Sequence, residues 1–251
     1  MSADDRRQEI LRRLQIDGYV EATALSKDLG VDASTIRRDL DALDRSGRAE
    51  RTHGGARPPA GAPTDIPYAV KEGERRREKV AIARTATADV RDGQTVVLDS
   101  GSTTYQIALE LRHKQGLTII TNDLRIGKYA ATLPSARLLV TGGELLGSVY
   151  TLVGERAVDF MGDYSADWAF MGADALDPIA GITNTNTLEI PIKRAMIRSA
   201  ERAVVVADSS KFGNRALAKV AAIDEVSKII TDRVSEIEDV EAYGDRLSFA
   251  E

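Results

Sequence analysis

The feature that most constrains the fold is an alternation of strand-like and helix-like segments between residues 95 and 231. Short apolar runs of the buried-strand type are followed by segments with helical spacing. This alternation is typical of an α/β domain with a largely parallel sheet. The sequence predicts strands at 95–98, 117–121, 137–141, 167–171, 203–207 and 228–231, and helices at 103–111, 124–131 and 189–200.

Polar and small residues follow several of these predicted strands. Open α/β sheets bind ligands at the carboxyl ends of their strands, so these residues are candidates for one crevice. They are Asp99-Ser100-Gly101-Ser102-Thr103-Thr104, Thr121-Asn122, Thr141-Gly142-Gly143, Gly172-Ala173-Asp174 and Asp208-Ser209-Ser210-Lys211.

The first of these segments lies where a strand turns into a helix. Gly101 allows the backbone to approach a ligand closely, and the amides at the helix start suit an anion such as phosphate. The hydroxyls of Ser102, Thr103 and Thr104 add further donors. A simple N-cap with small turn residues is the alternative for this string alone. The polar residues at the other strand ends favour a ligand site over a simple N-cap.

The charged candidates each have a structural alternative. Lys211, beside a strand end, would supply a cation to an anion site, or would be a solvated surface residue. Lys193 would contact the ligand, or would pair with Glu189 at i, i+4. Asp208 would belong to the same site, or would only cap the turn.

A segment rich in proline, residues 57–67, is typical of a linker. We therefore expect domains at 1–57 and 74–251, joined by a linker at 58–73. An amphipathic helix is expected at 74–90. We interpret its basic start, Arg75-Arg76-Arg77 with Lys79, as a solvated helix end. A second contact to DNA or to ligand phosphate is the alternative.

Three short helices are expected before this linker. The third places Ile36, Leu40 and Leu43 on one apolar stripe, with Asp32 as its N-cap and Gly47 after its end. The first carries Ile10, Leu11 and Leu14 and ends at Gly18, and the second has Thr23 as its N-cap, carries Leu25 and Leu29, and ends at Gly30. Residues 48–56 alternate like a strand and reach a Gly-Gly turn. The pattern predicts a winged helix-turn-helix.

The face of the third helix opposite the apolar stripe is polar. Charged residues there are usually only a solvated face, but the helix-turn-helix context favours DNA contact. The candidate DNA-contacting residues are Ser34, Thr35, Arg37 and Arg38 on the helix, with Arg51 and His53 in the wing.

These segments resemble the DeoR family of bacterial transcriptional regulators. The resemblance is carried by Thr35-Ile36-Arg37-Arg38-Asp39-Leu40, by Leu43 and Gly47, and by Arg51-Thr52-His53-Gly54-Gly55-Ala56. The strand-end motifs resemble the effector domain of the same family, which is similar in fold to ribose-5-phosphate isomerase and senses phosphorylated sugars or related metabolites. The resemblance implies an effector site made of Asp99, Gly101, Ser102, Thr103, Thr104, Thr121, Asn122, Gly142, Gly143, Asp174, Lys193, Asp208 and Lys211.

Composition narrows the chemistry and the location. The chain has no Cys and two His, which excludes disulfides and thiolate zinc sites, and we expect neither a metal nor a cofactor. No apolar run approaches the roughly 20 residues that span a bilayer, so we expect no membrane contact. The N-terminus is polar and charged, with no apolar stretch suited to a signal peptide, so we expect a cytoplasmic protein. Residues 1–57 carry no net charge within a chain of net charge −5. One such domain should bind DNA modestly, which favours a homo-oligomer, a dimer or tetramer.

The sequence therefore predicts a DNA-binding transcriptional regulator, a repressor of carbohydrate metabolism genes, whose binding to a double-stranded operator is modulated by a phosphorylated sugar. The alternative is an isomerase-like enzyme with a DNA-binding appendage, in which Asp174, Asp177, Glu189 and Lys211 supply a base and an electrophile. The N-terminal winged helix argues against the enzyme. A nucleoid-type binding protein without a ligand is disfavoured by the phosphate motif.

Overall fold

The chain folds into two units, Met1–Val70 and Lys71–Glu251. In this computed structural model the described residues are 2–17, 19–52, 54–59, 74–146, 149–232, 237 and 239–250. His53, Gly18 and residues 60–73, which make up most of the predicted linker, lie outside the described residues.

The smaller unit is a winged helix-turn-helix, as the sequence predicts. Its described residues form helices α1 (Ala3–Asp17), α2 (Ala22–Leu29) and α3 (Ala33–Arg45) and the strands β1 (Val20–Glu21), β2 (Glu50–Thr52) and β3 (Gly55–Arg57). The strands form an antiparallel sheet in the order β1-β3-β2. The apolar stripes of the helices meet in one core, made of Ile10, Leu14, Leu25, Ile36, Leu40 and Leu43 with smaller neighbours.

Two local predictions for this unit are wrong. Thr23 does not cap α2, because the helix begins one residue earlier and Glu21 occupies the cap position without a side-chain hydrogen bond. Glu21 belongs to strand β1, whose pairing with β3 fixes the backbone there. Gly55 is also not part of the turn, since it opens strand β3 and pairs with Thr52.

The larger unit is built on a seven-stranded sheet in which every pairing is parallel, which confirms the predicted α/β fold. Buried parallel strands are rich in branched apolar residues, as these are. The order is β15 (Leu247–Phe249), β14 (Lys228–Thr231), β12 (Ala200–Val206), β9 (Ala166–Met171), β4 (Thr95–Leu98), β5 (Thr118–Thr121) and β6 (Arg137–Val140).

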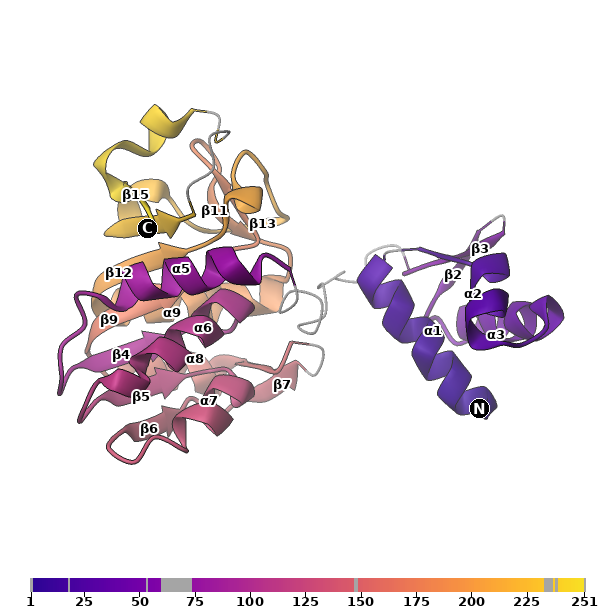
Figure 1. The fold of residues 1–251 in the computed structure, drawn as a ribbon, viewed down its shortest axis with the longest axis horizontal. Coiled ribbons are helices and arrows are strands. Elements are labelled where there is room, and N and C mark those ends of the chain that lie inside the picture. Colours follow the sequence, from indigo (N-terminus) through magenta and orange to yellow (C-terminus); the bar gives the residue numbers. More distant parts are fainter. Residues whose placement is uncertain are drawn as a thin grey trace. The chain divides into compact units, whose positions relative to one another are not determined.

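Helices cover both faces of this sheet (Figure 1). On one face lie α5 (Arg76–Thr87), α6 (Ser102–Glu110) and α7 (Leu124–Ala130), and on the other α8 (Glu155–Gly162) and α9 (Ile190–Ser199). Successive side chains of a strand point to opposite faces, so Val96 and Leu98 pack with Ile107, whereas Val97 packs in the core that contains Met196.

Several short elements were not predicted from the sequence. A hairpin pairs β7 (Glu144–Leu146) with β8 (Thr151–Val153), and a second antiparallel sheet contains β10 (Ala175–Asp177), β11 (Gly181–Asn184) and β13 (Ala218–Ala221). Short 3₁₀ segments lie at Leu111–His113 (η1), Thr187–Glu189 (η2), Ser209–Lys211 (η3), Ile223–Glu225 (η4) and Val240–Arg246 (η5).

The basic start of α5 is only partly the solvated helix end that the sequence predicts. Arg76 and Arg77 are exposed. Lys79 is buried, and its Nζ donates to the backbone oxygen of Glu74 at 2.8 Å. Arg75 turns back onto the sheet, where it donates to Ser209 Oγ at 2.9 Å. The prediction is wrong for Lys79, because this residue is buried. The side chain of Arg75 stays exposed but is bonded to a turn far away in the sequence, which helical spacing does not reveal.

Candidate functional site

Helix α3 presents its two arginines to solvent. Ile36, Leu40 and Leu43 are buried on its inner side, and Arg37 and Arg38 are exposed on its outer side. Neither arginine forms an ion pair with a described residue. Next to them, Ser34 is exposed and Thr35 half-buried. The predicted recognition face is therefore exposed to solvent, and its two arginines form no ion pair within the described part of the protein.

The start of α3 is capped by Asp32, as predicted. Its carboxylate accepts a hydrogen bond from the amide of Ser34 at 2.7 Å. The hydrogen bonds from Ser34, followed by the nearby charges of Arg37 and Arg38, hold the pKa of Asp32 below its usual value. The carboxylate is therefore ionised near neutral pH at the positive end of the helix.

Two acidic residues of this unit pair with arginines other than Arg37 and Arg38. Asp39 is buried, and its carboxylate accepts hydrogen bonds from Arg6 and Arg7 on α1, the second at 3.0 Å. Asp28 pairs with Arg13. These carboxylates therefore do not neutralise the exposed arginines of α3.

The structure places Arg51 in contacts within the fold. Its Nε lies 3.0 Å from Asp41 Oδ1, and its Nη1 donates to the Gly55 oxygen at 2.9 Å. Its backbone amide donates to Asp44 Oδ1 at 2.9 Å. Arg51 thus fastens the wing to α3, and its guanidinium would have to leave Asp41 to reach a phosphate. His53, the other predicted wing contact, lies outside the described residues.

In the larger unit, the sheet has a topological switch point between β4 and β9. The chain runs from β4 to β5 and β6 on one side, and from β9 to β12 and β14 on the other. Ligands of open α/β sheets bind at the carboxyl ends of the strands beside such a point. Asp99 follows β4 and Gly172 follows β9, and the Gly172 amide donates to Asp99 Oδ2 at 2.9 Å.

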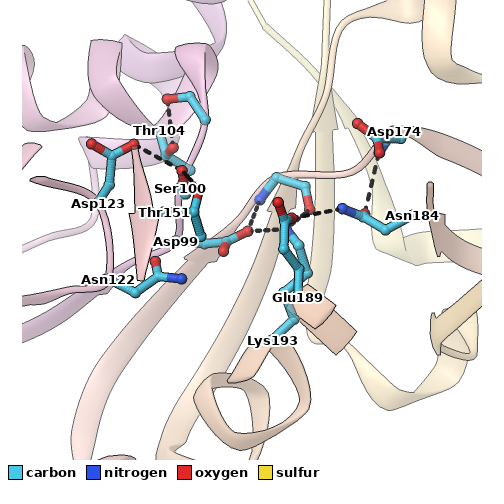
Figure 2. A network of polar contacts seen from close by, with 12 residues as sticks. Asp99, Ser100, Thr104, Asn122, Asp123, Thr151, Asp174, Asn184, Glu189 and Lys193 are labelled. Atoms are coloured by element: carbon cyan, nitrogen blue, oxygen red, sulfur yellow. Dashed lines mark hydrogen bonds and ion pairs between the residues drawn. The ribbon is translucent and has the colours of Figure 1, made fainter. Parts of the chain in front are cut away.

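A buried ion pair holds Asp99 in place (Figure 2). The Nζ of Lys193, 2% exposed, donates to Asp99 Oδ2 and also to the Gly172 oxygen at 3.1 Å. It lies 3.9 Å from Glu189 Oε2, so the i, i+4 pair that the sequence offered is also present. Burial lowers the pKa of Lys193, but the charges of Asp99 and Glu189 outweigh it and leave the pKa above its usual value. The ammonium therefore stays charged.

Hydrogen bonds connect this ion pair to the segment after β10, which is rich in Thr and Asn. Asn184 donates to Glu189 Oε2 at 3.1 Å, and its own oxygen accepts from the amide of Asp174 at 3.4 Å. The carboxylate of Asp174 accepts from the amide of Thr185 at 3.0 Å. The structure thus brings Asp174, Lys193 and Asp99 into one connected network (Figure 2).

Two acceptor oxygens at this sheet edge are buried without a hydrogen-bond partner among the described residues. They are Oδ1 of Asp99 and Oδ1 of Asn122, at the ends of neighbouring strands β4 and β5. The amide nitrogen of Asn122 donates to the Leu152 oxygen at 3.3 Å. Buried acceptors without donors cost free energy, so a ligand that brings hydroxyl donors would be favoured here.

The loop between β4 and α6 leaves donors free at the helix start. No described residue accepts a hydrogen bond from the backbone amides of Ser102, Thr103 or Thr104. Gly101, with φ 156° and ψ 162°, occupies a region that is essentially restricted to glycine, and a Cβ there would lie 3.3 Å from Thr104 Oγ1. The hydroxyl of Thr104 donates to the Gly101 oxygen, so it braces the loop.

Ser100, Asp123 and Thr151 support this loop. Ser100 lies in the strand-end motif but not among the implied effector residues, and sequence analysis did not select Asp123 or Thr151. Thr151 donates to Ser100 Oγ at 2.6 Å, and Ser100 donates to Asp123 Oδ2 at 2.9 Å. Asp123 also caps α7, and burial raises its pKa. Its place before the predicted helix at 124–131 was the available signal. Thr121 donates to the Leu98 oxygen at 2.7 Å and is wholly internal.

The glycines after β6 serve the fold. A Cβ on Gly143 would lie 2.3 Å from the backbone oxygen of Val153, so the close backbone approach found there is to strand β8. Gly142 has φ 69° and is exposed.

The turn after β12 carries the last two predicted residues. Asp208 is buried and caps η3 by accepting from the amide of Ser210. Lys211 is half-buried and has no ion pair with a described residue. No hydrogen bond or ion pair among the described residues joins this turn to the Asp99 network. Within the described ranges, no group of three or more His, Asp or Glu is arranged to hold a metal.

Comparison with protein families matches both units. Residues 6–60 match the DeoR-like helix-turn-helix domain, and residues 74–233 match the DeoR C terminal sensor domain.

Named relatives cover nearly the whole chain. A putative aga operon transcriptional repressor of Escherichia coli O157:H7 is 33% identical over 91% of this chain and 86% of its own length. The glycerol-3-phosphate regulon repressor of Escherichia coli K12 is 29% identical, with 92% of each chain covered. Among solved structures, ribose 5-phosphate isomerase A from Neisseria gonorrhoeae is similar over 55% of this chain and 53% of its own, with 17% identity and a TM-score of 0.40. A likeness at that level assigns no activity.

Proposed function

Because the chain belongs to the DeoR family of transcriptional regulators, we propose that it represses genes of carbohydrate metabolism and that a phosphorylated sugar alters its affinity for the operator. The relatives that span the chain are named as repressors, and this chain itself carries the helix-turn-helix domain, so the isomerase-like enzyme is not favoured.

Residues 1–57 would bind the operator through α3. Arg37 and Arg38, with Ser34 and Thr35, lie on an exposed face and would contact bases or phosphates in the major groove. Arg51 would contribute first by fixing the wing, since Asp41 and Gly55 already engage it. Residues 58–73 would connect this domain to an effector-binding and oligomerisation domain at 74–251.

The observation that carries the effector proposal is the combination of free donors and free acceptors at one sheet edge. Unpaired amides at the start of α6 suit a phosphate, and the hydroxyls of Ser102 and Thr103 lie beside them. The unpaired oxygens of Asp99 and Asn122 suit sugar hydroxyls. A phosphorylated sugar carries both complements in one molecule.

The charged residues would divide into two groups. We assign Lys193 and Asp174 to positioning, because Lys193 bonds to Asp99 and Asp174 bonds to Asn184 in the same network. Lys211, with Asp208 beside it, would bring the counter-charge for the phosphate from the end of β12. Gly142 and Gly143 would shape the edge next to β6.

Assembly and location are part of the proposal. A DNA-binding domain with no net charge has few phosphate contacts, so the protein would act as a homodimer or tetramer held by residues 74–251. It would work in the cytoplasm. Over the described residues, the structure contains no helix with the length and apolar character needed to cross a membrane.

Calorimetry with matched ligand pairs tests the effector proposal. A phosphorylated sugar should bind, and its unphosphorylated parent should bind poorly, because the donors at the start of α6 are then unused. Thr103→Val keeps the side-chain shape but removes a hydroxyl, so it should weaken binding by roughly 0.5–1.5 kcal/mol. Thr118→Val, at the opposite end of β5, is the matched control. A preference for the neutral sugar, or equal losses in both variants, would place the phosphate elsewhere.

A further inference from the structure

The side chain of Arg75 joins the start of α5 to the ends of two strands. Its Nη1 donates to Ser209 Oγ at 2.9 Å, and its guanidinium lies 3.7 Å from Asp208 Oδ1 and 3.8 Å from Asp232 Oδ2. Asp208 follows β12 and Asp232 follows β14, and they are 2% and 5% exposed. One guanidinium therefore serves two buried carboxylates on neighbouring strands.

These contacts form a closed cluster with the turn after β12. Asp232 accepts from the backbone amide of Ser209 at 2.6 Å and from its hydroxyl at 3.1 Å. Among the described residues, Arg75 is the only basic side chain within salt-bridge distance of either carboxylate. Buried carboxylates need a counter-charge, so the position of Arg75 depends on where this turn lies.

The backbone of Arg75 is held in an unfavourable conformation. With φ 48° and ψ 41° it lies in the left-handed region, at the N-cap of α5. Non-glycine residues persist there only when the surrounding contacts fix them, and such strain concentrates at switch regions. Its side chain is held by Ser209, Asp208 and Asp232, and its backbone oxygen accepts a hydrogen bond from the amide of Lys79 at 3.1 Å.

The place of Arg75 in the chain gives this cluster two neighbours of functional interest. In the sequence, only Glu74 separates it from the 58–73 segment predicted as the linker. The turn that it contacts, η3 (Ser209–Lys211), also carries Lys211, the proposed counter-charge for the effector phosphate. The same short turn thus carries both the contacts to Arg75 and the proposed contact to the effector.

We propose that Arg75 couples effector binding to operator binding, an inference that rests on the proposed function. Without effector, Asp208 and Asp232 hold the guanidinium and so keep the N-cap of α5 in its strained conformation. A phosphate bound by Lys211 brings negative charge to the turn and competes for the guanidinium. Arg75 then changes its contacts and its strained backbone at the start of α5 relaxes, which lowers the affinity for the operator.

The adjacent arginines provide matched controls. Arg76 and Arg77 are exposed, carry the same charge, lie on the same helix start, and make no ion pair with a described residue. Arg77→Ala removes a positive charge without touching the cluster. Arg75→Lys keeps the positive charge, but lysine lacks the planar guanidinium that contacts both carboxylates at once.

The test measures operator affinity with and without effector in the full-length protein. The operator is a duplex selected from random DNA by the parent protein, and the probes are inorganic phosphate, glycerol 3-phosphate, ribose 5-phosphate and fructose 6-phosphate at millimolar concentration. The most effective probe should weaken operator binding of the parent by a factor of roughly 5 to 150. Arg75→Ala should bring this factor close to 1, Arg75→Lys should give an intermediate factor, and Arg77→Ala should keep it.

Two separate affinities make the result specific to coupling. In Arg75→Ala, operator affinity without a probe should fall towards that of the parent with the probe bound, because the contacts that the effector breaks are already absent, and probe binding should not weaken. An unchanged coupling factor in Arg75→Ala would overturn the inference and leave the proposed function intact. A large loss of probe affinity would also overturn it, since Arg75 would then belong to the binding site. A parent that responds to none of the probes would overturn the proposed function and this inference with it. If Arg75→Ala unfolds, Arg75→Lys and Asp232→Asn carry the same comparison.

Discussion

Lys193 shows at the residue scale how burial decides between two roles. Sequence spacing offers either a pair with Glu189 or a ligand contact. In the structure its ammonium is buried and bonded to Asp99, with Glu189 3.9 Å away. A buried carboxylate needs this partner, so Lys193 fixes Asp99, whose other oxygen remains for a ligand.

Lys193→Met should therefore destabilise the larger unit by about 3–5 kcal/mol, because it leaves a buried carboxylate uncompensated. Denaturant unfolding of the full chain measures this. Lys219→Met, at an exposed position of β13, is the control and should change stability little. The double variant Lys193→Met with Asp99→Asn should recover part of the loss. A single variant as stable as the control would contradict the structural role.

Arg37 and Arg38 are the residues on which operator recognition should depend. A bidentate contact to guanine should cost roughly 1–3 kcal/mol on Arg→Ala and relax the sequence preference. A phosphate contact should instead weaken binding to all sequences and reduce the salt slope by about 1. Operator titrations at several salt concentrations distinguish the two. Arg12→Ala, on the exposed side of α1, is the control. If the variants of Arg37 and Arg38 bind the operator as tightly as this control, α3 is not the recognition helix.

At the scale of elements, hydrophobic periodicity was sufficient to predict a helix or strand wherever that element has a regular apolar pattern. The strands β4, β5, β6, β9, β12 and β14 and the helices between them follow it, and the structure contains them. The strands β10, β11 and β13 lack the continuous apolar run of the predicted strands, because their sequences are Ala-Leu-Asp, Gly-Ile-Thr-Asn and Ala-Lys-Val-Ala. They become strands because β11 pairs with β13 more than thirty residues later in the chain. Helix α8 buries only Ala157 and Met161, which leaves little periodicity to detect.

The cap of α3 gives a prediction at this scale. Asp32 satisfies the amide of Ser34, so Asp32→Ala should destabilise the smaller unit by about 1 kcal/mol. Asp32→Ser preserves a capping oxygen and should restore most of the stability. Thermal unfolding followed by helical circular dichroism measures both. Equal stability of the Ala and Ser variants would mean that the cap contributes nothing.

At the scale of the whole molecule, the parallel topology explains what sequence could predict of the site. Residues after parallel strands must meet at one edge, so Asp99, Asn122 and Asp174 could be grouped without a structure. The contacts that hold these site residues in place could not be predicted in this way. Ser100 with Thr151 and Arg75 with Asp232 join positions far apart in sequence, and no local pattern marks either pair.

The neutral charge of residues 1–57 predicts assembly. One winged helix has few phosphate contacts, so two or more must act together at high effective concentration. Sedimentation at micromolar concentration should show at least a dimer, and the isolated residues 74–251 should show the same state. A monomer that still protects a full operator from nuclease would contradict this.

The central claim is that a phosphorylated sugar releases the operator through the site at the sheet edge. The most direct measurement is operator binding as a function of sugar-phosphate concentration in the parent, Thr103→Val and Lys211→Ala. Linkage requires that a ligand which weakens DNA binding also binds the DNA-bound protein more weakly by the same factor. The account predicts that both variants bind the operator like the parent without ligand but need a higher sugar-phosphate concentration for release. Release at the parent's concentration in both variants would contradict it.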